Sequence, residues 1–169
     1  YQTGTGVMIG LPGQTIRNLV DDLLFFRDFD VDMIGMGPYL PHPDTPLTQA
    51  NPGFPPDSER QLLLGLKMIA ACRLLIPDAN IASTTALHAL APDGRERGLL
   101  AGANVVMPNL DAPEYKREYN LYAGKPNLDD GMEECLSSLV DSIAAIGESV
   151  AWDSPGDPIH FYTRIARAR

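Results

Sequence analysis

The sequence is short of cysteine, of positive charge and of long apolar runs. Its two cysteines, Cys72 and Cys135, lie too far apart to match the ligand spacing of a zinc or iron–sulfur site. So few cysteines are typical of a protein of the reducing cytoplasm. Because both fall among apolar residues at helical spacing, we expect both thiols to be buried and unreactive.

The balance of charge excludes a broad nucleic-acid-binding surface. The chain carries 22 acidic and 13 basic residues, a formal net charge of -9, whereas such a surface needs clustered lysine and arginine. Arg164, Arg167 and Arg169 gather near the end of the sequence, where we expect no more than a solvated terminus. We therefore expect no nucleic-acid partner.

No apolar run approaches the roughly 18 residues of a membrane span, so we expect no membrane contact. A basic segment followed by an apolar one is also missing before the first predicted strand, so no signal peptide is predicted. The sequence opens on Tyr1 and enters an apolar strand almost at once. We therefore expect it to begin partway through a longer protein.

Short apolar strands alternate with helical patterns four times, which predicts an α/β fold with parallel strands and crossover helices. Four units are half of the eight that close a barrel, so the sequence predicts either a small open sheet or half of a (β/α)8 barrel. The predicted strands are 3–11, 31–37, 80–85 and 104–109, and the predicted helices are 15–29, 58–76, 93–101 and 129–146. The prolines of 38–57 predict a long loop without regular helix.

Chemistry-capable residues follow the predicted strands, while the segments from helix to strand (DFD, PDA and AGA) are plainer. Because the carboxyl ends of parallel strands meet at one edge, these residues predict one shared binding site. The stretches are GLPGQT after the first strand, GPYLPHPDTP after the second, TTALH at the end of the third and MPN at the end of the fourth.

The GLPGQT corner is open to two interpretations. Its glycines allow close approach to a ligand, and Thr15 can cap a helix whose free N–H groups would suit an anion. A tight, well-capped turn explains the same residues, since neither a Walker lysine nor a complete G-x-G-x-x-G is present. Reactive serine and cysteine motifs are missing too, which favours a site that orients a reactive cofactor.

The three histidines give weaker signals. His42 and Asp44 could ligate a metal or act as acid and base, but their proline-spaced loop favours hydrogen bonds that hold the loop itself. For His88 and His160 the sequence offers no partner, so we expect them to bond locally or to lie at the surface.

Five stretches together resemble, in this order, the second half of the radical S-adenosylmethionine (SAM) enzymes related to biotin synthase, and most of all the HydE-type maturases of the iron–iron hydrogenase. The resemblance implies that residues 1–148 are strands and helices 5 to 8 of a (β/α)8 TIM barrel and that 149–169 are a C-terminal extension. The stretches are GVMIGLPGQT, IGMGPYLPHPDTPL, IASTTAL, GANVVMPN and YKREYNLYAGK.

The resemblance also implies a set of site residues. Where the wider family pattern of the first strand ends in glutamate, this chain has Gly13, so no acidic role is expected there. The residues that match the family positions beside SAM are Gly6, Met8, Gly10, Gly37 and Pro38. Those that match the substrate cavity are Thr84, Thr85, Met107, Tyr119 and Tyr122.

By resemblance, a 4Fe–4S cluster bound outside this chain would reduce SAM to methionine and a 5′-deoxyadenosyl radical. Because the Cys-x-x-x-Cys-x-x-Cys loop is missing from the sequence, we expect the isolated chain to be inactive. A second cluster found in some members should be absent, since only Cys135 lies in its region. The implied partners are a small-molecule or organometallic substrate, the missing N-terminal half-barrel and other hydrogenase maturases.

Two alternatives stay open. One is a relative that acts on a small organic substrate, such as a biotin synthase-like or methylornithine synthase-like enzyme. A half-barrel without catalysis that binds a small ligand or another subunit would also carry a site at the strand ends.

Overall fold

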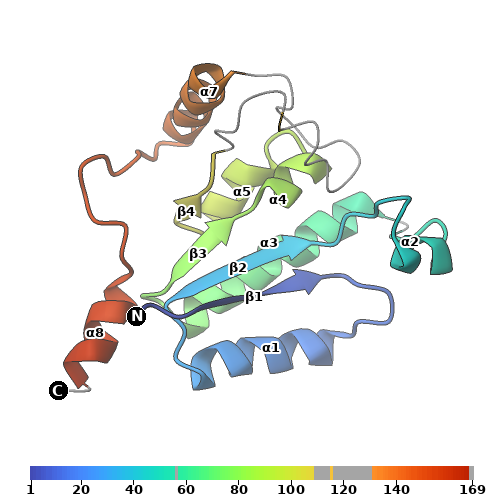
Figure 1. Cartoon of the computed structure of the whole chain (residues 1–169), viewed down its shortest axis with the longest axis horizontal. Coiled ribbons are helices and arrows are strands. Elements are labelled where there is room, and N and C mark those ends of the chain that lie inside the picture. The colour runs from blue at the N-terminus through green and yellow to red at the C-terminus, as the bar shows by residue number, and fades with distance from the viewer. Residues whose placement is uncertain (56, 109–114, 116–130, 168–169) are drawn as a thin grey trace.

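The computed structural model describes residues 1–55, 57–108, 115 and 131–167. Its centre is a parallel four-stranded sheet whose strands lie side by side in chain order. This arrangement confirms the parallel α/β fold predicted from the sequence (Figure 1). The strands are β1 (Gly4–Ile9), β2 (Met33–Pro38), β3 (Asn80–Ser83) and β4 (Val105–Val106).

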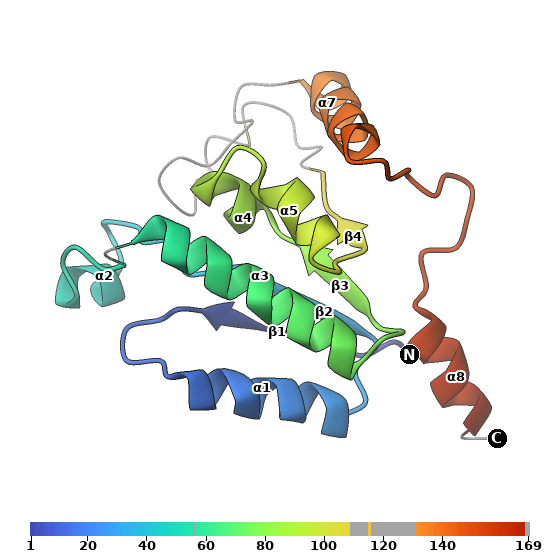
Figure 2. The same ribbon diagram turned by 180° about the vertical axis from the view of Figure 1, so that it is seen from behind.

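Three helices, α1 (Ile16–Asp28), α3 (Ser58–Leu75) and α5 (Gly94–Leu100), lie on one face of this sheet (Figures 1 and 2). Along β1 the side chains alternate: Val7 and Ile9 pack into the core under the helices, while Met8 is half exposed on the opposite face. A doubly wound sheet carries helices on both faces. Strands in chain order with helices on one face are instead what a segment of a barrel has.

The core lies between the sheet and these helices. Its fully buried members come from the strands, from α1 and α3, and from the short helix α4 (Thr85–Leu90). They include Ile9, Phe26, Ile34, Met36, Ile69, Cys72, Ile81 and Leu87. Cys72 and Cys135 are both buried, as predicted, and burial raises the pKa of the Cys72 thiol to about 11.

Two short helices differ from the prediction. The loop 38–57 contains α2 (Pro46–Ala50), because Pro46 stands at the start of the helix, where its missing N–H would have no partner anyway. The predicted strand 80–85 ends at Ser83, and α4 (Thr85–Leu90) begins immediately with Thr84 as its N-cap. β-branched threonines suit a strand and a helix cap alike, so the pattern misplaced this boundary.

The end of the chain also differs from the prediction. After α7 (Met132–Ala145), which the sequence predicts, the chain forms α8 (Ile159–Arg167), which it does not. Figure 1 places α8 beside the N-terminus, at the amino ends of the strands. None of the helices in the described part of the chain is both long and apolar enough to cross a membrane.

Candidate functional site

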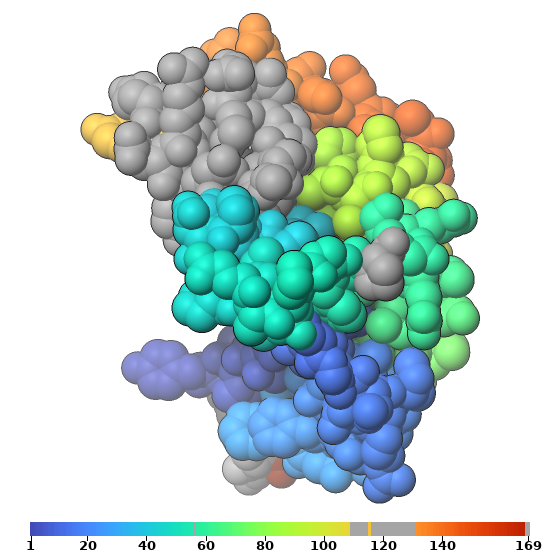
Figure 3. All heavy atoms as spheres, turned by 90° about the vertical axis from the view of Figure 1, so that its right-hand side faces the viewer, coloured from blue at the N-terminus to red at the C-terminus, as the bar shows by residue number. Residues whose placement is uncertain are grey.

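A cavity of about 480 Å³ opens at the carboxyl ends of β1, β2 and β3. Figure 3 looks at this end of the molecule, where the loops that follow β1 and β2 lie side by side. Of the ten residues predicted to bind SAM or substrate, those that line the cavity are Gly6, Met8, Gly37, Pro38, Thr84 and Thr85. The fold therefore brings together residues from three separate motifs.

The wall of this cavity is neutral, with glycine backbone, a thioether and hydroxyl groups. Gly37 allows the side chain of Thr84 to come close, because a Cβ on Gly37 would lie 3.0 Å from its Oγ1. The Thr84 hydroxyl in turn donates to the carbonyl oxygen of Met36 at 3.3 Å. Gly6 has a second role, since a Cβ there would lie 2.1 Å from the carbonyl oxygen of Gly35.

Gly10 does not line the cavity but shapes its rim. Its φ of +77° lies in the left-handed region, and a Cβ would stand 2.2 Å from Oε1 of Gln61. Gln61 is buried, and its Nε2 donates to the carbonyl oxygens of Ile9 at 2.8 Å and Tyr39 at 3.4 Å. This amide ties the carboxyl ends of β1 and β2 together. The sequence pattern did not single out Gln61, which ends the polar stretch SERQ at the start of α3.

The corner after β1 uses its own side chains to satisfy its N–H groups. Oε1 of Gln14 accepts hydrogen bonds from the N–H of Gly10 and of Leu11. Thr15 caps α1 as predicted: its Oγ1 accepts from the N–H of Asn18, whose side chain accepts from the N–H of Thr15 at 2.9 Å. These internal bonds favour the capped-turn interpretation over a phosphate loop.

The remaining predicted residues lie elsewhere. Met107 follows β4, is 51% exposed and is not among the residues that line the cavity. Tyr119 and Tyr122 lie outside the described residues. The His42–Asp44 loop holds itself, as predicted, since the Asp44 N–H donates to Nδ1 of His42 at 3.3 Å. In the described part of the chain no group of three or more His, Cys, Asp or Glu residues could hold a metal ion.

A second polar constellation, which the sequence did not reveal, lies at the amino ends of the strands. Asp32 is fully buried. Arg164 of α8 forms a bidentate ion pair with it, in which Nε donates to Oδ1 at 3.2 Å and Nη2 donates to Oδ2. Burial alone would raise the pKa of Asp32, but the hydrogen bonds from Arg164 and from the backbone of Thr3 lower it below its usual value. Arg164 is thus no free solvated terminus, contrary to the prediction.

His160 also has partners far away in the sequence. Its Nε2 lies 2.9 Å from Oδ1 of Asp30, and its Nδ1 lies 3.0 Å from Oδ1 of Asp78. Burial by itself would lower the pKa of His160, but the two carboxylates outweigh it and raise the pKa above its usual value. The prediction of local or surface bonding for His160 is therefore wrong, and so is the view that the DFD and PDA segments are plain.

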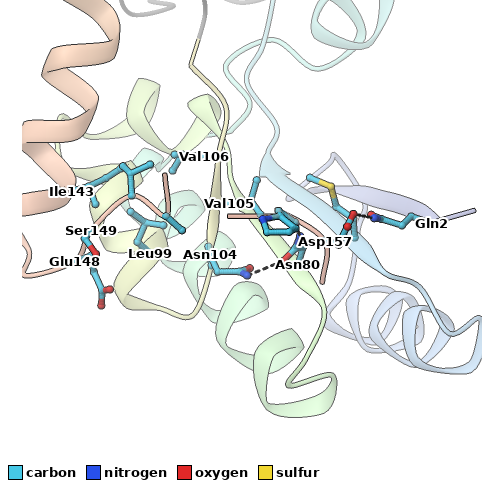
Figure 4. Close-up of a pocket in the computed structure, with 16 residues that line it drawn as sticks. Gln2, Asn80, Leu99, Asn104, Val105, Val106, Ile143, Glu148, Ser149 and Asp157 are labelled. Atoms are coloured by element: carbon cyan, nitrogen blue, oxygen red, sulfur yellow. Dashed lines mark hydrogen bonds between the residues drawn. The ribbon is translucent and has the colours of Figure 1, made fainter. Parts of the chain in front are cut away.

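A larger cavity of about 620 Å³ opens along β4 and the segment after α7 (Figure 4). Asn80 and Asn104 meet beside it, with Nδ2 of Asn104 donating to Oδ1 of Asn80 at 2.8 Å. None of the ten predicted site residues lines this cavity. Because parallel α/β sheets bind ligands at the carboxyl ends of their strands, we place the candidate site in the smaller cavity.

The chain is similar to two proteins of known activity. It is 45% identical over 156 residues to the FeFe hydrogenase maturase subunit HydE of Thermotoga maritima, covering 92% of this chain and 43% of that protein. It is 31% identical over 150 residues to the 3-methylornithine synthase of Methanosarcina acetivorans, covering 87% of this chain and 38% of that protein. No family model matches. These similarities confirm the resemblance drawn from the motifs, and the chain spans less than half the length of either relative.

Proposed function

We propose that residues 1–148 are the C-terminal half of a radical SAM (β/α)8 barrel of the HydE type. In this proposal β1 to β4 are barrel strands 5 to 8, and residues 149–169 form an extension. The one-sided helix cover and the chain-order sheet support the assignment. So does the 45% identity to a HydE subunit over most of this chain.

The observation that carries the proposal is the convergence at the carboxyl ends of the strands. Gly6 and Met8 of β1, Gly37 of β2 and Thr84 after β3 line one cavity, although they lie in separate motifs of the sequence. In a closed barrel this is the face on which the reaction takes place.

The lining chemistry fits SAM. Gly35 has no atom within 4 Å of an added Cβ, so its backbone leaves room for a ligand, and the Met8 thioether is a soft apolar neighbour. The hydroxyls of Thr84 and Thr85 supply the small number of polar groups that orient a ligand. When bound and reduced in the whole enzyme, SAM supplies a 5′-deoxyadenosyl radical, and the residues of this chain hold and orient it.

The described residues do not fit an iron–sulfur cluster. Cys72 is buried between α3 and the sheet, and no group of metal-ligating side chains occurs in the described ranges. The cluster would be bound by residues of the longer protein that lie outside these 169. We therefore propose that the isolated chain cannot reduce SAM, and that an N-terminal half-barrel is its obligatory partner.

For the substrate we propose a small molecule or an organometallic precursor used in hydrogenase maturation, with other maturases as further partners. The relative named as a HydE maturase subunit supports this choice. A cytoplasmic location is proposed from the two buried thiols, which would stay reduced there.

A chimera tests the proposed function. The part of Thermotoga maritima HydE that precedes the region of similarity is joined to this chain, and the product is reconstituted anaerobically with iron and sulfide. We expect the chimera to cleave SAM into methionine and 5′-deoxyadenosine. The 169-residue chain, treated in the same way, should bind no cluster and form no 5′-deoxyadenosine. Turnover by the isolated chain would refute the half-barrel assignment.

A second function is supported by the 31% identity to a 3-methylornithine synthase. The same chimera separates the two, because activation of a hydrogenase requires the maturation activity, whereas an amino-acid rearrangement yields a product detectable by mass spectrometry. Tight SAM binding by the isolated chain, without a cluster and without turnover in the chimera, would favour the binding half-barrel instead.

A further inference from the structure

The C-terminal segment 156–167 is held against the amino end of the sheet by contacts with several distant parts of the chain. The carbonyl oxygen of Gly156 accepts from Nδ2 of Asn80 at 2.7 Å, and the N–H of His160 donates to the carbonyl oxygen of Asp78 at 3.1 Å. Arg164 reaches both Asp32 and the carbonyl oxygen of Tyr1, the latter at 3.0 Å. The segment therefore closes the end of the sheet opposite to the candidate site.

The geometry around His160 demands a charged ring. Both ring nitrogens face carboxylate oxygens, at 2.9 Å and 3.0 Å. An ionised carboxylate only accepts hydrogen bonds, and a neutral imidazole has a single N–H to donate. Only the imidazolium can satisfy Asp30 and Asp78 together. With His160 neutral, a ring lone pair would face a carboxylate oxygen, which is repulsive.

The charged groups around His160 come from two loops and two helices. Asp30 lies between α1 and β2, and Asp78 lies between α3 and β3. Arg164 stands one turn further along α8 and interacts with Asp30 as well as Asp32, and Arg73 of α3 interacts with Asp78. The two arginines weaken the attraction between His160 and the aspartates but do not remove it, since each arginine is bonded to other oxygens.

The Arg164–Asp32 pair differs from the His160 contacts in its response to pH. Guanidinium keeps its proton over the whole physiological range, and the pKa of Asp32 is lowered, so this pair is charged at every pH above that lowered value. His160 is the one contact of the segment that gains or loses its charge near neutrality.

We propose that α8 is a proton-dependent latch on the amino end of the sheet, closed by protonated His160 against Asp30 and Asp78 and anchored by Arg164. The sign follows from the raised pKa of His160. Docking is strongest below the usual histidine pKa and weakens as the pH rises through the higher pKa of the docked state. Each latch that opens in this range releases one proton to water.

Opening the latch would also uncover the larger cavity. Asp157 and Gly156, at the start of the docked segment, form part of its lining together with Gln2 (Figure 4). Movement of α8 away from Asp30 and Asp78 would draw these residues with it. The proposal does not depend on the SAM site, because all of its contacts lie at the other end of the strands.

The test follows the docking of α8 and the charge of His160 together. On the full 169-residue chain, NMR gives the pKa of each histidine, and amide hydrogen exchange, corrected for its intrinsic pH dependence, gives the protection of α8. We expect His160 to titrate above 6.5, the usual value. Across that titration the protection factors of the α8 amides should fall about tenfold. This is the change expected when one charge-assisted hydrogen bond at a partly exposed site is lost.

Two variants complete the test. H160Q should lower the protection of α8 at pH 6 and abolish its change with pH, whereas H42Q, at a histidine in the loop after β2, should leave both as they are. Protection that does not change while His160 titrates, or a pH dependence that persists in H160Q, would overturn the proposal. If the isolated chain does not fold, the same measurements on the chimera decide, with the same outcomes.

Discussion

The two ends of the sheet are built from opposite chemistry. At the carboxyl end, the cavity is lined by glycines, threonines and apolar side chains and carries no charged residue. At the amino end, the side chains of Asp30, Asp32 and Asp78 meet His160 and Arg164. In barrels the carboxyl face carries function and the amino face carries stability. The difference shows that the loops after the strands can form a binding site while the loops before the strands form ion pairs that hold the fold together.

The largest effect is expected at the rim of the carboxyl end. G10A must place a Cβ at a φ of +77° and against the amide of Gln61, so it should destabilise the chain by about 3 kcal/mol. G13A is the matched control, because Gly13 has a φ of +79° but no atom within 4 Å of the added Cβ. G13A should lower the free energy of unfolding by about 1 kcal/mol. Equal losses, measured by urea unfolding, would show that Gln61 does not restrict Gly10.

The next effect concerns the amide that joins β1 to β2. Q61M keeps the shape of the side chain but removes the donor to the carbonyl oxygens of Ile9 and Gly10. Because these buried acceptors lose a partner, the free energy of unfolding measured in urea should fall by about 1.5 kcal/mol. Q49M, at an exposed glutamine of α2, should change stability by less than about 0.5 kcal/mol. If Q61M unfolds with the same free energy as the unchanged chain, backbone hydrogen bonds alone hold the carboxyl ends of β1 and β2 together.

At the amino end, the R164M variant removes the ion pair between Arg164 and Asp32. It leaves the carboxylate of buried Asp32 without its cation. Because the Arg164 side chain is partly exposed, water can take its place, and Tm at pH 7 should fall by about 3 °C. Because the pKa of Asp32 is lowered in the folded chain, the loss should be present above the usual aspartate pKa and fade as the pH falls through the lowered value. R167M, one turn further along α8, is the control and should unfold at the temperature of the unchanged chain.

The smallest effect is expected for ligand binding in the chimera. A Cβ on Gly37 would lie 3.0 Å from Oγ1 of Thr84 and would narrow the cavity. G37A should therefore weaken SAM binding about threefold in a calorimetric titration, as expected for a small steric change in a pocket. G4A, on the same face of the sheet but outside the cavity, has room for its Cβ at 3.6 Å from the nearest atom. An equal loss in G4A would argue against the cavity as the SAM site.

Much of the fold could be predicted because strands and helices leave local patterns. Apolar runs marked β1, β2 and β3, and helical spacing marked α1, α3, α5 and α7. The exceptions arose where one residue type serves two structures. Thr85 opens a helix instead of ending a strand, and Pro46 starts α2 in a loop predicted to contain none.

The candidate site was partly predictable for the same reason. Gly6, Met8, Gly37, Pro38, Thr84 and Thr85 belong to motifs that end strands, and parallel strands deliver their ends to one edge. Gln61 was missed because its partners are 52 and 22 positions away. His160 was missed because Asp30 and Asp78 are 130 and 82 positions away.

The sequence by itself determined the α/β alternation, the resemblance to radical SAM enzymes and the strand ends on which a site would lie. Backbone propensity and apolar periodicity are local, so they can be recognised before any folding. Only the tertiary structure decided that helices cover one face of the sheet, and that α8 returns to the start of the strands. It also decided that Asp32 is fully buried against Arg164, because the pairing of distant charges depends on how the chain packs and leaves no periodic trace in the sequence.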